Sequence, residues 1–452
     1  MAFHNLLCET AIALHGAQSL AFAKEGLSLY RGSAEAKENY VREKLREILR
    51  YAVENTAYYA EAFAGREPEI ENAPVLTKAV LRQSYGEICS SISRKGLYEN
   101  TSGGSTGEPV KFLQDREYYD KNFGNKILFG LLNGKRPGDF EIKLWGSERD
   151  ILQGDIGIKE KLINFIYNRM LLNSFVMSED RMLQYLDCIN TRQPVSIWAY
   201  ADSIYELACC ALREKVRMFS PRVIITTAGV LYDDMRKTIQ RCFPGSLICN
   251  QYGSREVGAV GIEVRGEKGI RTFDHSVYIE ILNESTGQIS REGTGRILVT
   301  SLINKAMPLI RFDIGDIGTL TQQTGEREGS FGVLTELKGR VNSHIRRKSG
   351  ALIHGEYFTH LFYGKSWIRN FQVVQHRDYS LELLIRPVRD GERVLGDIEE
   401  MKRGVKAVMP EAELTVRYVE EIPRLKSGKY QFVISEVEGA EQEKQDERYI
   451  HS

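Results

Sequence analysis

A nine-residue stretch has the composition of an anion-binding loop: Thr101-Ser102-Gly103-Gly104-Ser105-Thr106-Gly107-Glu108-Pro109. Its three glycines let several backbone N–H groups turn toward one small anion, and its four hydroxyls add further donors. Phosphate is the ligand that such a loop suits best. The stretch is not the P-loop of NTPases, because no Lys-Ser or Lys-Thr pair follows the last glycine. The same composition also suits a flexible surface linker, so the choice depends on the rest of the chain.

The totals limit the classes of function. Lys and Arg number 61 and Asp and Glu number 61, so no net charge attracts the chain to nucleic acid, and any anion site must be local. A length of 452 residues suggests about two or three domains. The seven cysteines are scattered and form no Cys-x-x-Cys pair, which favours a reducing cytoplasm over a disulfide framework or a zinc site.

The N-terminal residues 1–23 contain an apolar patch at residues 11–14. The patch lacks a basic leader and is followed by polar residues, so we expect neither a signal peptide nor a spanning helix. Two alternatives stay open: an amphipathic helix packed on the body of the protein, or one that rests on a membrane surface.

The order of the expected elements indicates an α/β fold. Residues 38–63 and 164–190 have helical periodicity, and strand–turn–helix units are expected at 196–215 and 222–242, with a third opening at 247. Ligands gather at the carboxyl ends of strands in such sheets, which directs attention to the turns at 228 and 252. Beyond residue 258 the pattern becomes β-rich.

Four separate stretches resemble the motifs of the adenylate-forming superfamily. They are residues 102–109, Tyr252-Gly253-Ser254-Arg255-Glu256, Ile310-Arg311-Phe312-Asp313-Ile314-Gly315-Asp316, and Gly339-Arg340 together with Ser427-Gly428-Lys429. Their order and spacing, with Pro74-Val75-Leu76-Thr77-Lys78, are most similar to the phenylacetate-CoA ligase branch, which includes the CapK-like proteins of capsular polysaccharide clusters. The resemblance implies a large N-terminal domain with layered α/β sheets and a β-rich subdomain (1–341), a small mobile α+β C-terminal domain (342–435) and a disordered tail (436–452).

The resemblance also implies a chemistry. Such enzymes join a carboxylate to the α-phosphate of ATP, release pyrophosphate, and pass the acyl group to a thiol or amine. Two anions must meet, so the protein must position them and neutralise charge. A mobile lysine ammonium at about 4 Å from the developing charge contributes roughly 4 kcal/mol at an effective dielectric near 20, on the order of a thousandfold in rate. Lys429 is the expected catalytic residue, although most lysines are simply solvated.

The family roles transfer to this chain residue by residue. The phosphates would lie on the loop residues Ser102, Gly103, Gly104, Ser105, Thr106 and Gly107, and the adenine between Ala228, Gly229, Tyr252 and Gly253. Ser254 would supply a hydroxyl, Asp316 would bind the ribose, and Arg340 the ribose or a phosphate. Glu256 would bind Mg²⁺, and Asn342 occupies the hinge position between the domains.

Some positions depart from the family pattern. Arg255 stands where relatives carry Thr or Ser, Asp313 where an Arg is common, and Val110 where a Lys often follows the loop. Trp198, Tyr200, Ala201 and Thr227 are candidates to line an acyl pocket suited to an aryl or small acid, and core packing explains them equally well. The basic tract at 346–348 suits either coenzyme A phosphates or a solvated loop.

Three functions follow from these observations. The first is ATP- and Mg²⁺-dependent activation of a small carboxylic acid, followed by transfer to coenzyme A. The second sends the acyl or aminoacyl group to an amine or hydroxyl acceptor in surface polysaccharide assembly. The third is a nucleotide-binding scaffold without turnover, for which only Arg255 and Asp313 argue. The sequence names neither the acid nor the acceptor, and it is compatible with a monomer or a homodimer.

Overall fold

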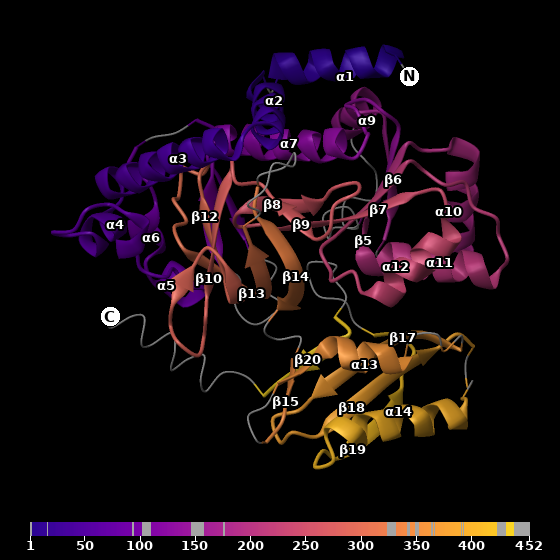
Figure 1. Cartoon of the computed structure of the whole chain (residues 1–452). Helices are drawn as coiled ribbons and strands as arrows, with labels where there is room; N and C mark the ends of the chain where they lie inside the picture. Colours follow the sequence, from indigo (N-terminus) through magenta and orange to yellow (C-terminus); the bar gives the residue numbers. More distant parts are fainter. Residues whose placement is uncertain are drawn as a thin grey trace.

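The computed structural model describes the chain except for residues 1, 16, 93–94, 102–109, 146–157, 175–176, 323–330, 341–343, 349–351, 363–364, 366, 390, 392, 423–430 and 438–452. A large N-terminal body carries a smaller C-terminal unit on one side, drawn in orange and yellow in Figure 1. Helices and sheets alternate in layers through the body, so the expected α/β class is confirmed.

A 12-stranded mixed sheet runs through the body, in the order β11-β10-β12-β13-β14-β9-β8-β7-β6-β5-β3-β4. Its parallel half consists of β4 (Arg169–Asn173), β3 (Glu141–Trp145), β5 (Ser196–Tyr200), β6 (Val223–Thr227) and β7 (Leu247–Ser254). One face packs on α10 (Glu179–Arg192), α11 (Ala201–Arg213) and α12 (Asp233–Cys242), and the other on α7 (Arg116–Leu132). Strands buried on both faces explain the continuous apolar runs that made them recognisable.

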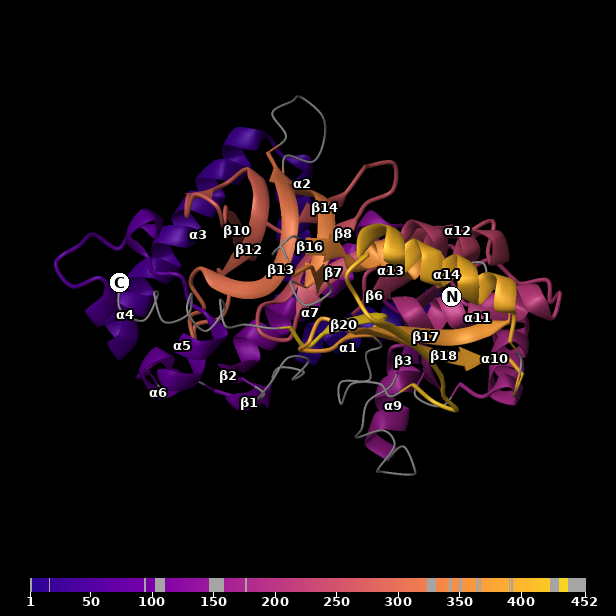
Figure 2. The same ribbon diagram turned by 90° about the horizontal axis from the view of Figure 1, so that it is seen from below.

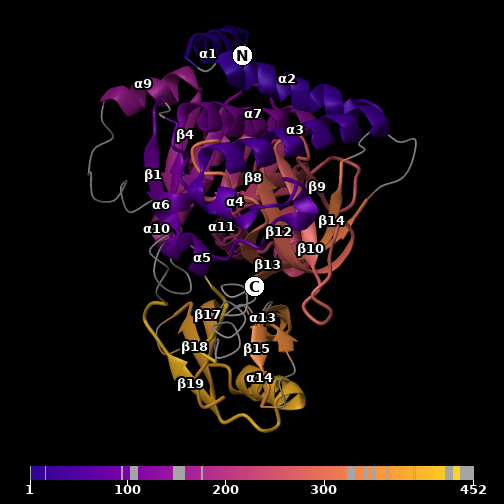
Figure 3. The same ribbon diagram turned by 90° about the vertical axis from the view of Figure 1, so that its left-hand side faces the viewer.

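The antiparallel half completes the same sheet. Its strands are β8 (Gly258–Glu263), β9 (Ile270–Thr272), β10 (Val277–Leu282), β11 (Ile289–Ser290), β12 (Gly293–Ser301), β13 (Phe312–Thr321) and β14 (Val333–Arg340). They share a core with α3 (Ala34–Asn55), α4 (Ala57–Ala62), α5 (Lys78–Gln83) and α6 (Tyr85–Ile88), which follow one another along this flank in Figure 3. A short 3₁₀ turn, η1 (Ile70–Asn72), joins α4 to the strand-like residues before α5.

Two helices, α1 (Ala2–His15) and α2 (Ala17–Arg31), lie across the top of the body, with α9 (Ile158–Ile166) beside α1 (Figure 1). The buried side chains of Cys8 and Ile12 show that α1 packs on the body, which was one of the two alternatives. No single described helix has the length and apolar character to cross a membrane. The α1–α2 pair passes that test only together, across a bend of 105°.

The C-terminal unit is α+β, as expected. A four-stranded sheet in the order β19-β18-β17-β20 consists of β17 (Ile368–Gln375), β18 (Leu381–Pro387), β19 (Leu414–Tyr418) and β20 (Val433–Ser435). Helices α13 (Gly355–Phe362) and α14 (Leu395–Val408) share a core with it, and α13, α14, β17 and β18 lie together in Figure 2. A hairpin of β15 (His344–Arg346) and β16 (Leu352–His354) begins the unit, and its Ile345 packs in the same core. The predicted boundary at 341/342 and most of the predicted tail fall outside the described residues, so both remain predictions.

Three expectations about elements were wrong. Residues 164–190 are not one helix, because β4 lies between α9 and α10, where its pairing with β3 holds it extended. The helix expected over 38–63 begins earlier, at Ala34, and breaks at Thr56, whose side chain caps α4 by accepting a hydrogen bond from the backbone of Tyr59. The third strand–turn–helix unit does not exist, since β7 turns directly into the antiparallel strand β8.

Candidate functional site

The turn after β6 adopts a strained backbone. Ala228 has a φ of 68°, in the left-handed region that residues with a Cβ rarely occupy. Beside it, a Cβ added to Gly229 would lie 3.8 Å from the Cβ of Ala201, so the ends of β5 and β6 are close together. The carboxyl ends of β5 and β6 therefore lie side by side at one edge of the sheet. This is where the sequence analysis expected a ligand site, at the turn at 228.

Tyr252 and Asp316 meet although 64 positions separate them along the chain. The phenolic O–H of Tyr252 donates to the carboxylate Oδ2 of Asp316 at 2.8 Å. Asp316 on β13 is also paired in register with Arg340 on β14. The Tyr252 ring is buried, while Asp316 is only half-buried and still reachable by solvent or a ligand. Three residues predicted to surround a nucleoside are thus brought to one place.

The glycine-rich loop itself lies outside the described residues, but both of its ends are fixed. The flanking strands β1 (Tyr98–Thr101) and β2 (Lys111–Gln114) pair antiparallel, with Thr101 opposite Lys111. The guanidinium of Arg255 donates to the carbonyl of Thr101 at 3.3 Å. The loop therefore begins next to the segment that carries Tyr252 and Glu256.

Gln114 was not recognised from the sequence as part of this region. Its side-chain amide donates to the backbone carbonyl of Arg255 at 2.9 Å, and the side chain is almost fully buried. The contact ties the strand that leaves the glycine loop to the turn between β7 and β8. No spacing signal in the sequence could have revealed it, because the two residues lie 141 positions apart.

The close approach of β7 and β8 explains why a glycine stands at position 253. A Cβ added to Gly253 would lie 2.3 Å from the carbonyl oxygen of Gly258, so no larger residue fits there. The Ser254 hydroxyl accepts a hydrogen bond from the backbone N–H of Val257 at 3.4 Å. Ser254 therefore shapes the turn, and the phosphate contact predicted for it remains a prediction.

Glu256 lies in this turn with only 6% of its surface exposed. Within the part of the chain that the structure describes, its carboxylate forms no ion pair or hydrogen bond. A buried carboxylate without a protein partner suits a hard cation, and Mg²⁺ uses one or two carboxylates together with phosphate oxygens and water. The residue thus fits the predicted metal role. No group of three or more His, Cys, Asp or Glu able to hold a metal occurs among the described residues.

The acyl-pocket candidates divide between two sides of the sheet. Trp198 and Tyr200 share the face toward α7, where the Trp198 ring lies 6.2 Å from Phe129 and the Tyr200 ring lies 4.4 Å from Trp145. Ala201 belongs to the core under α11, and Thr227 ends β6. All four are at most 9% exposed, so their packing role is evident, and the pocket role of each remains a prediction.

Asp313 has a structural explanation. Its carboxylate forms a buried ion pair with Arg296, and its other oxygen accepts from the backbone N–H of Gly315 at 2.9 Å. It therefore faces the interior and not a phosphate. The neighbouring Arg311 is likewise buried, paired with Glu280 at 2.8 Å. Asp313 therefore has a structural role and no longer argues for a scaffold without turnover.

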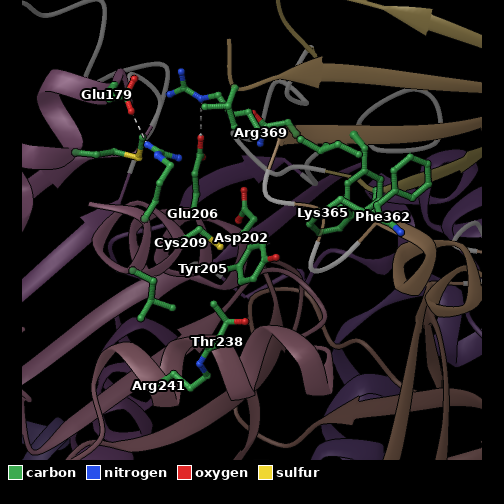
Figure 4. A pocket seen from close by; sticks show the side chains of 18 residues that line it. Glu179, Asp202, Tyr205, Glu206, Cys209, Thr238, Arg241, Phe362, Lys365 and Arg369 are labelled. Carbon is green, nitrogen blue, oxygen red and sulfur yellow. Dashed lines mark hydrogen bonds and ion pairs between the residues drawn. The ribbon is translucent and has the colours of Figure 1, made fainter. Parts of the chain in front are cut away.

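A cavity of about 350 Å³ lies between the body and the C-terminal unit. Figure 4 shows its two walls, with Asp202, Tyr205 and Cys209 from α11 on one side and Phe362, Lys365 and Arg369 on the other. Arg369 crosses the interface: it donates to the carbonyl of Met177 at 2.7 Å and lies 3.6 Å from the Glu206 carboxylate. Asp202 follows Ala201 directly, so the cavity adjoins the ends of the parallel strands.

Other predicted residues lie outside the described part of the chain. These are the loop residues 102–107, the catalytic candidate Lys429, the hinge residue Asn342 and the side chain of Arg340. Their roles remain predictions. In the basic tract at 346–348, Arg347 pairs with Glu411 at 3.0 Å within the C-terminal unit.

Comparisons with known proteins agree with this geometry. Residues 345–436 match the family described as the CapK C-terminal domain. A phenylacetate-coenzyme A ligase from Pseudomonas putida is 23% identical over 323 residues, which cover 67% of this chain and 71% of that protein.

Solved structures show the same fold over nearly the whole chain. A 2-hydroxyisobutyryl-CoA ligase in its postadenylation state, in complex with R3-HIB-AMP, matches over 93% of both chains with a TM-score of 0.68 and 16% identity. The same ligase with 2-HIB-AMP and CoA in the thioesterification state gives a TM-score of 0.56 over the same shares, at 18% identity. These comparisons agree with the resemblance inferred from the sequence: the chain has the fold of these ligases, and residues 345–436 match the CapK C-terminal domain.

Proposed function

We propose that this protein activates a carboxylic acid with ATP as an acyl-adenylate, releases pyrophosphate, and transfers the acyl group to coenzyme A. The observation that carries the proposal is the meeting of distant motifs at one corner of the sheet. Tyr252 contacts Asp316, Asp316 is in register with Arg340, and Arg255 contacts the residue that enters the glycine loop. The phenylacetate-coenzyme A ligase relative and the CoA ligases of the same fold support the assignment.

Each group at this corner has a task in the reaction. The Asp316 carboxylate, oriented by the Tyr252 hydroxyl, accepts hydrogen bonds from the ribose hydroxyls. The loop after β1 holds the phosphates, and the Ala228 turn and Tyr252 flank the base. Glu256 would hold Mg²⁺, which supplies charge neutralisation to the phosphates when bound. Lys429 adds its ammonium where the carboxylate meets the α-phosphate.

The test is carboxylate-dependent exchange of labelled pyrophosphate into ATP, measured over a broad panel of acids. We expect exchange with at least one acid, and a fall of about a thousandfold in Lys429→Ala at the 4 kcal/mol expected for its ammonium. Lys237→Ala serves as the control, because that side chain is 73% exposed on α12 and pairs only with Asp234 within the described residues. Exchange that survives in Lys429→Ala would remove the lysine from the mechanism, and no exchange with any acid would favour the scaffold.

We also propose a second candidate for the acceptor, because residues 345–436 match the CapK C-terminal domain. In this alternative the acyl or aminoacyl group passes to an amine or hydroxyl during surface polysaccharide assembly. A thioester formed on addition of coenzyme A supports the first acceptor. Exchange without thioester formation, followed by acylation of an amino sugar, supports the second. A cytoplasmic location fits both alternatives, since both consume ATP.

A further inference from the structure

Four basic side chains gather on the α7 side of the parallel sheet, and we call them the basic cluster: Lys126, Lys135, Lys143 and Arg169. Lys143 lies on β3, in register with Trp198 on β5, and its ammonium stands 5.2 Å from the centre of the Trp198 ring. Arg169 begins β4, opposite Glu141. Lys126 comes from α7, and Lys135 from the turn that follows it. Distant segments thus bring the cluster to one place.

The cluster has an excess of positive charge. Among the described residues, Glu141 is the one carboxylate within ion-pair distance of Lys143, at 3.9 Å, which is too long for a hydrogen bond. Glu141 is already used by Lys135, whose ammonium makes a short ion pair with its other oxygen. Arg169 bonds the neutral side chain of Asn164 at 2.9 Å. Among the described residues, Glu141 is thus the one carboxylate that an ion pair joins to this cluster, and it pairs with Lys135 and Lys143.

This excess has an electrostatic cost. Burial lowers the pKa of the Lys143 ammonium to about 7; Glu141 opposes the shift, and the repulsion of Arg169, Lys126 and Lys135 adds to it. Yet the side chain remains 24% exposed, and Lys126 is open to solvent. A buried charge without a full complement of partners is unfavourable. Because the described part of the chain provides this reachable cluster with one carboxylate, Glu141, the cluster suits an anionic ligand.

The cluster lies on the same face of the sheet as two of the residues predicted to line an acyl pocket, Trp198 and Tyr200. Side chains alternate along a strand, so Lys143 and Trp145 share one face of β3, as Trp198 and Tyr200 do on β5. Trp145 contacts Tyr200 at the carboxyl ends of these strands, next to the turn at Ala228. Residues two positions apart lie about 7 Å from each other along a strand. The backbone of Trp145, at the carboxyl end of β3, is therefore about 7 Å from that of Lys143.

Resting on the function proposed above, we propose that the activated acid carries a second carboxylate, which binds to Lys143 and Lys126 while the first is adenylated. An extended acid of about six carbons spans this depth, because its five carbon–carbon bonds of about 1.5 Å each advance the chain by slightly less than their length. Trp198 and Tyr200 would enclose the methylene groups between the two acid groups. The substrate class is thus a short dicarboxylic acid.

The test compares matched acids in the pyrophosphate-exchange assay: succinate with butyrate, glutarate with valerate, and adipate with hexanoate. For wild-type protein we expect kcat/KM to be at least about tenfold higher for a dicarboxylate than for its partner, from one charge-assisted hydrogen bond. Lys143→Met should lower this ratio about tenfold or more, while the control Lys237→Met should leave it unchanged. Lys126→Gln, on an exposed side chain, should lower the ratio in the same direction if Lys143→Met fails to fold.

The outcomes separate the two proposals. A wild-type preference for the monocarboxylic acids, or an unchanged ratio in both folded cluster variants, overturns the second-carboxylate proposal and leaves acid activation intact. Absence of exchange with every acid, in protein that binds ATP and melts cooperatively, overturns acid activation and the proposal that rests on it.

Discussion

Tyr252→Phe tests the nucleotide site most directly. The substitution removes one hydroxyl, which donates to Asp316 at 2.8 Å, and leaves the ring in the core, where only 7% of the residue is exposed. A hydrogen bond to a charged group contributes about 1.5–3 kcal/mol, and water reaches the half-buried carboxylate and replaces part of it. We therefore expect a loss near 1.4 kcal/mol, which is about a tenfold rise in KM for ATP. The carboxylate keeps its charge but loses its orientation, so kcat should change much less.

The assay is pyrophosphate exchange at varied ATP and saturating acid, with the melting temperature recorded for each variant. Tyr357→Phe is the matched control, because its hydroxyl donates to the carbonyl of Gly404 at 2.7 Å within the C-terminal unit. It should leave KM for ATP unchanged. An unaltered KM in folded Tyr252→Phe would mean that Asp316 does not bind the ribose. A KM that rises equally for ATP and for the acid would point to a general disturbance of the sheet edge.

Two further predictions concern buried charges. Asp313→Asn removes the carboxylate closest to Arg296, whose side chain is 7% exposed. We therefore expect the free energy of unfolding, measured in urea, to fall by about 3 kcal/mol without a change in KM for ATP. An altered KM for ATP would mean that Asp313 contacts the phosphates. The second prediction concerns Lys143, whose pKa burial lowers to about 7, so its charge is lost as pH rises through 7. Above that pH, KM for a dicarboxylate should rise while KM for the matching monocarboxylate stays level. Lys143→Met should abolish this difference.

The sequence allowed the elements with local signals to be predicted. The units expected at 196–215 and 222–242 are present as β5 with α11 and β6 with α12, because apolar strand runs and helical periodicity need no information from elsewhere. The meeting of Tyr252 with Asp316 followed from motif order, and its hydrogen bond could not have been predicted from spacing alone.

Features fixed by pairing between distant segments were missed. The run Arg169–Asn173 is short, apolar and flanked by helices, so its pattern is equally compatible with helix, and only pairing with β3 makes it a strand. The same pairing creates the basic cluster, since it places Arg169 opposite Glu141. Lys143 alternates with apolar residues in a strand whose sequence gives no sign that both of its faces are covered.

The interface between the two units bears on how both half-reactions could share one site. Its described polar contacts include the two made by Arg369, to a carbonyl and to a carboxylate 3.6 Å away, and a cavity of about 350 Å³ leaves part of the interface unfilled. Such an interface resembles a transient one, which domains can leave and re-form at low energetic cost. A loop that delivers a lysine for one step and withdraws for the next needs this kind of attachment, because a fully packed apolar interface would hold the C-terminal unit in one position. The chemistry assigned to Lys429 therefore depends on an interface that the C-terminal unit can leave and re-form.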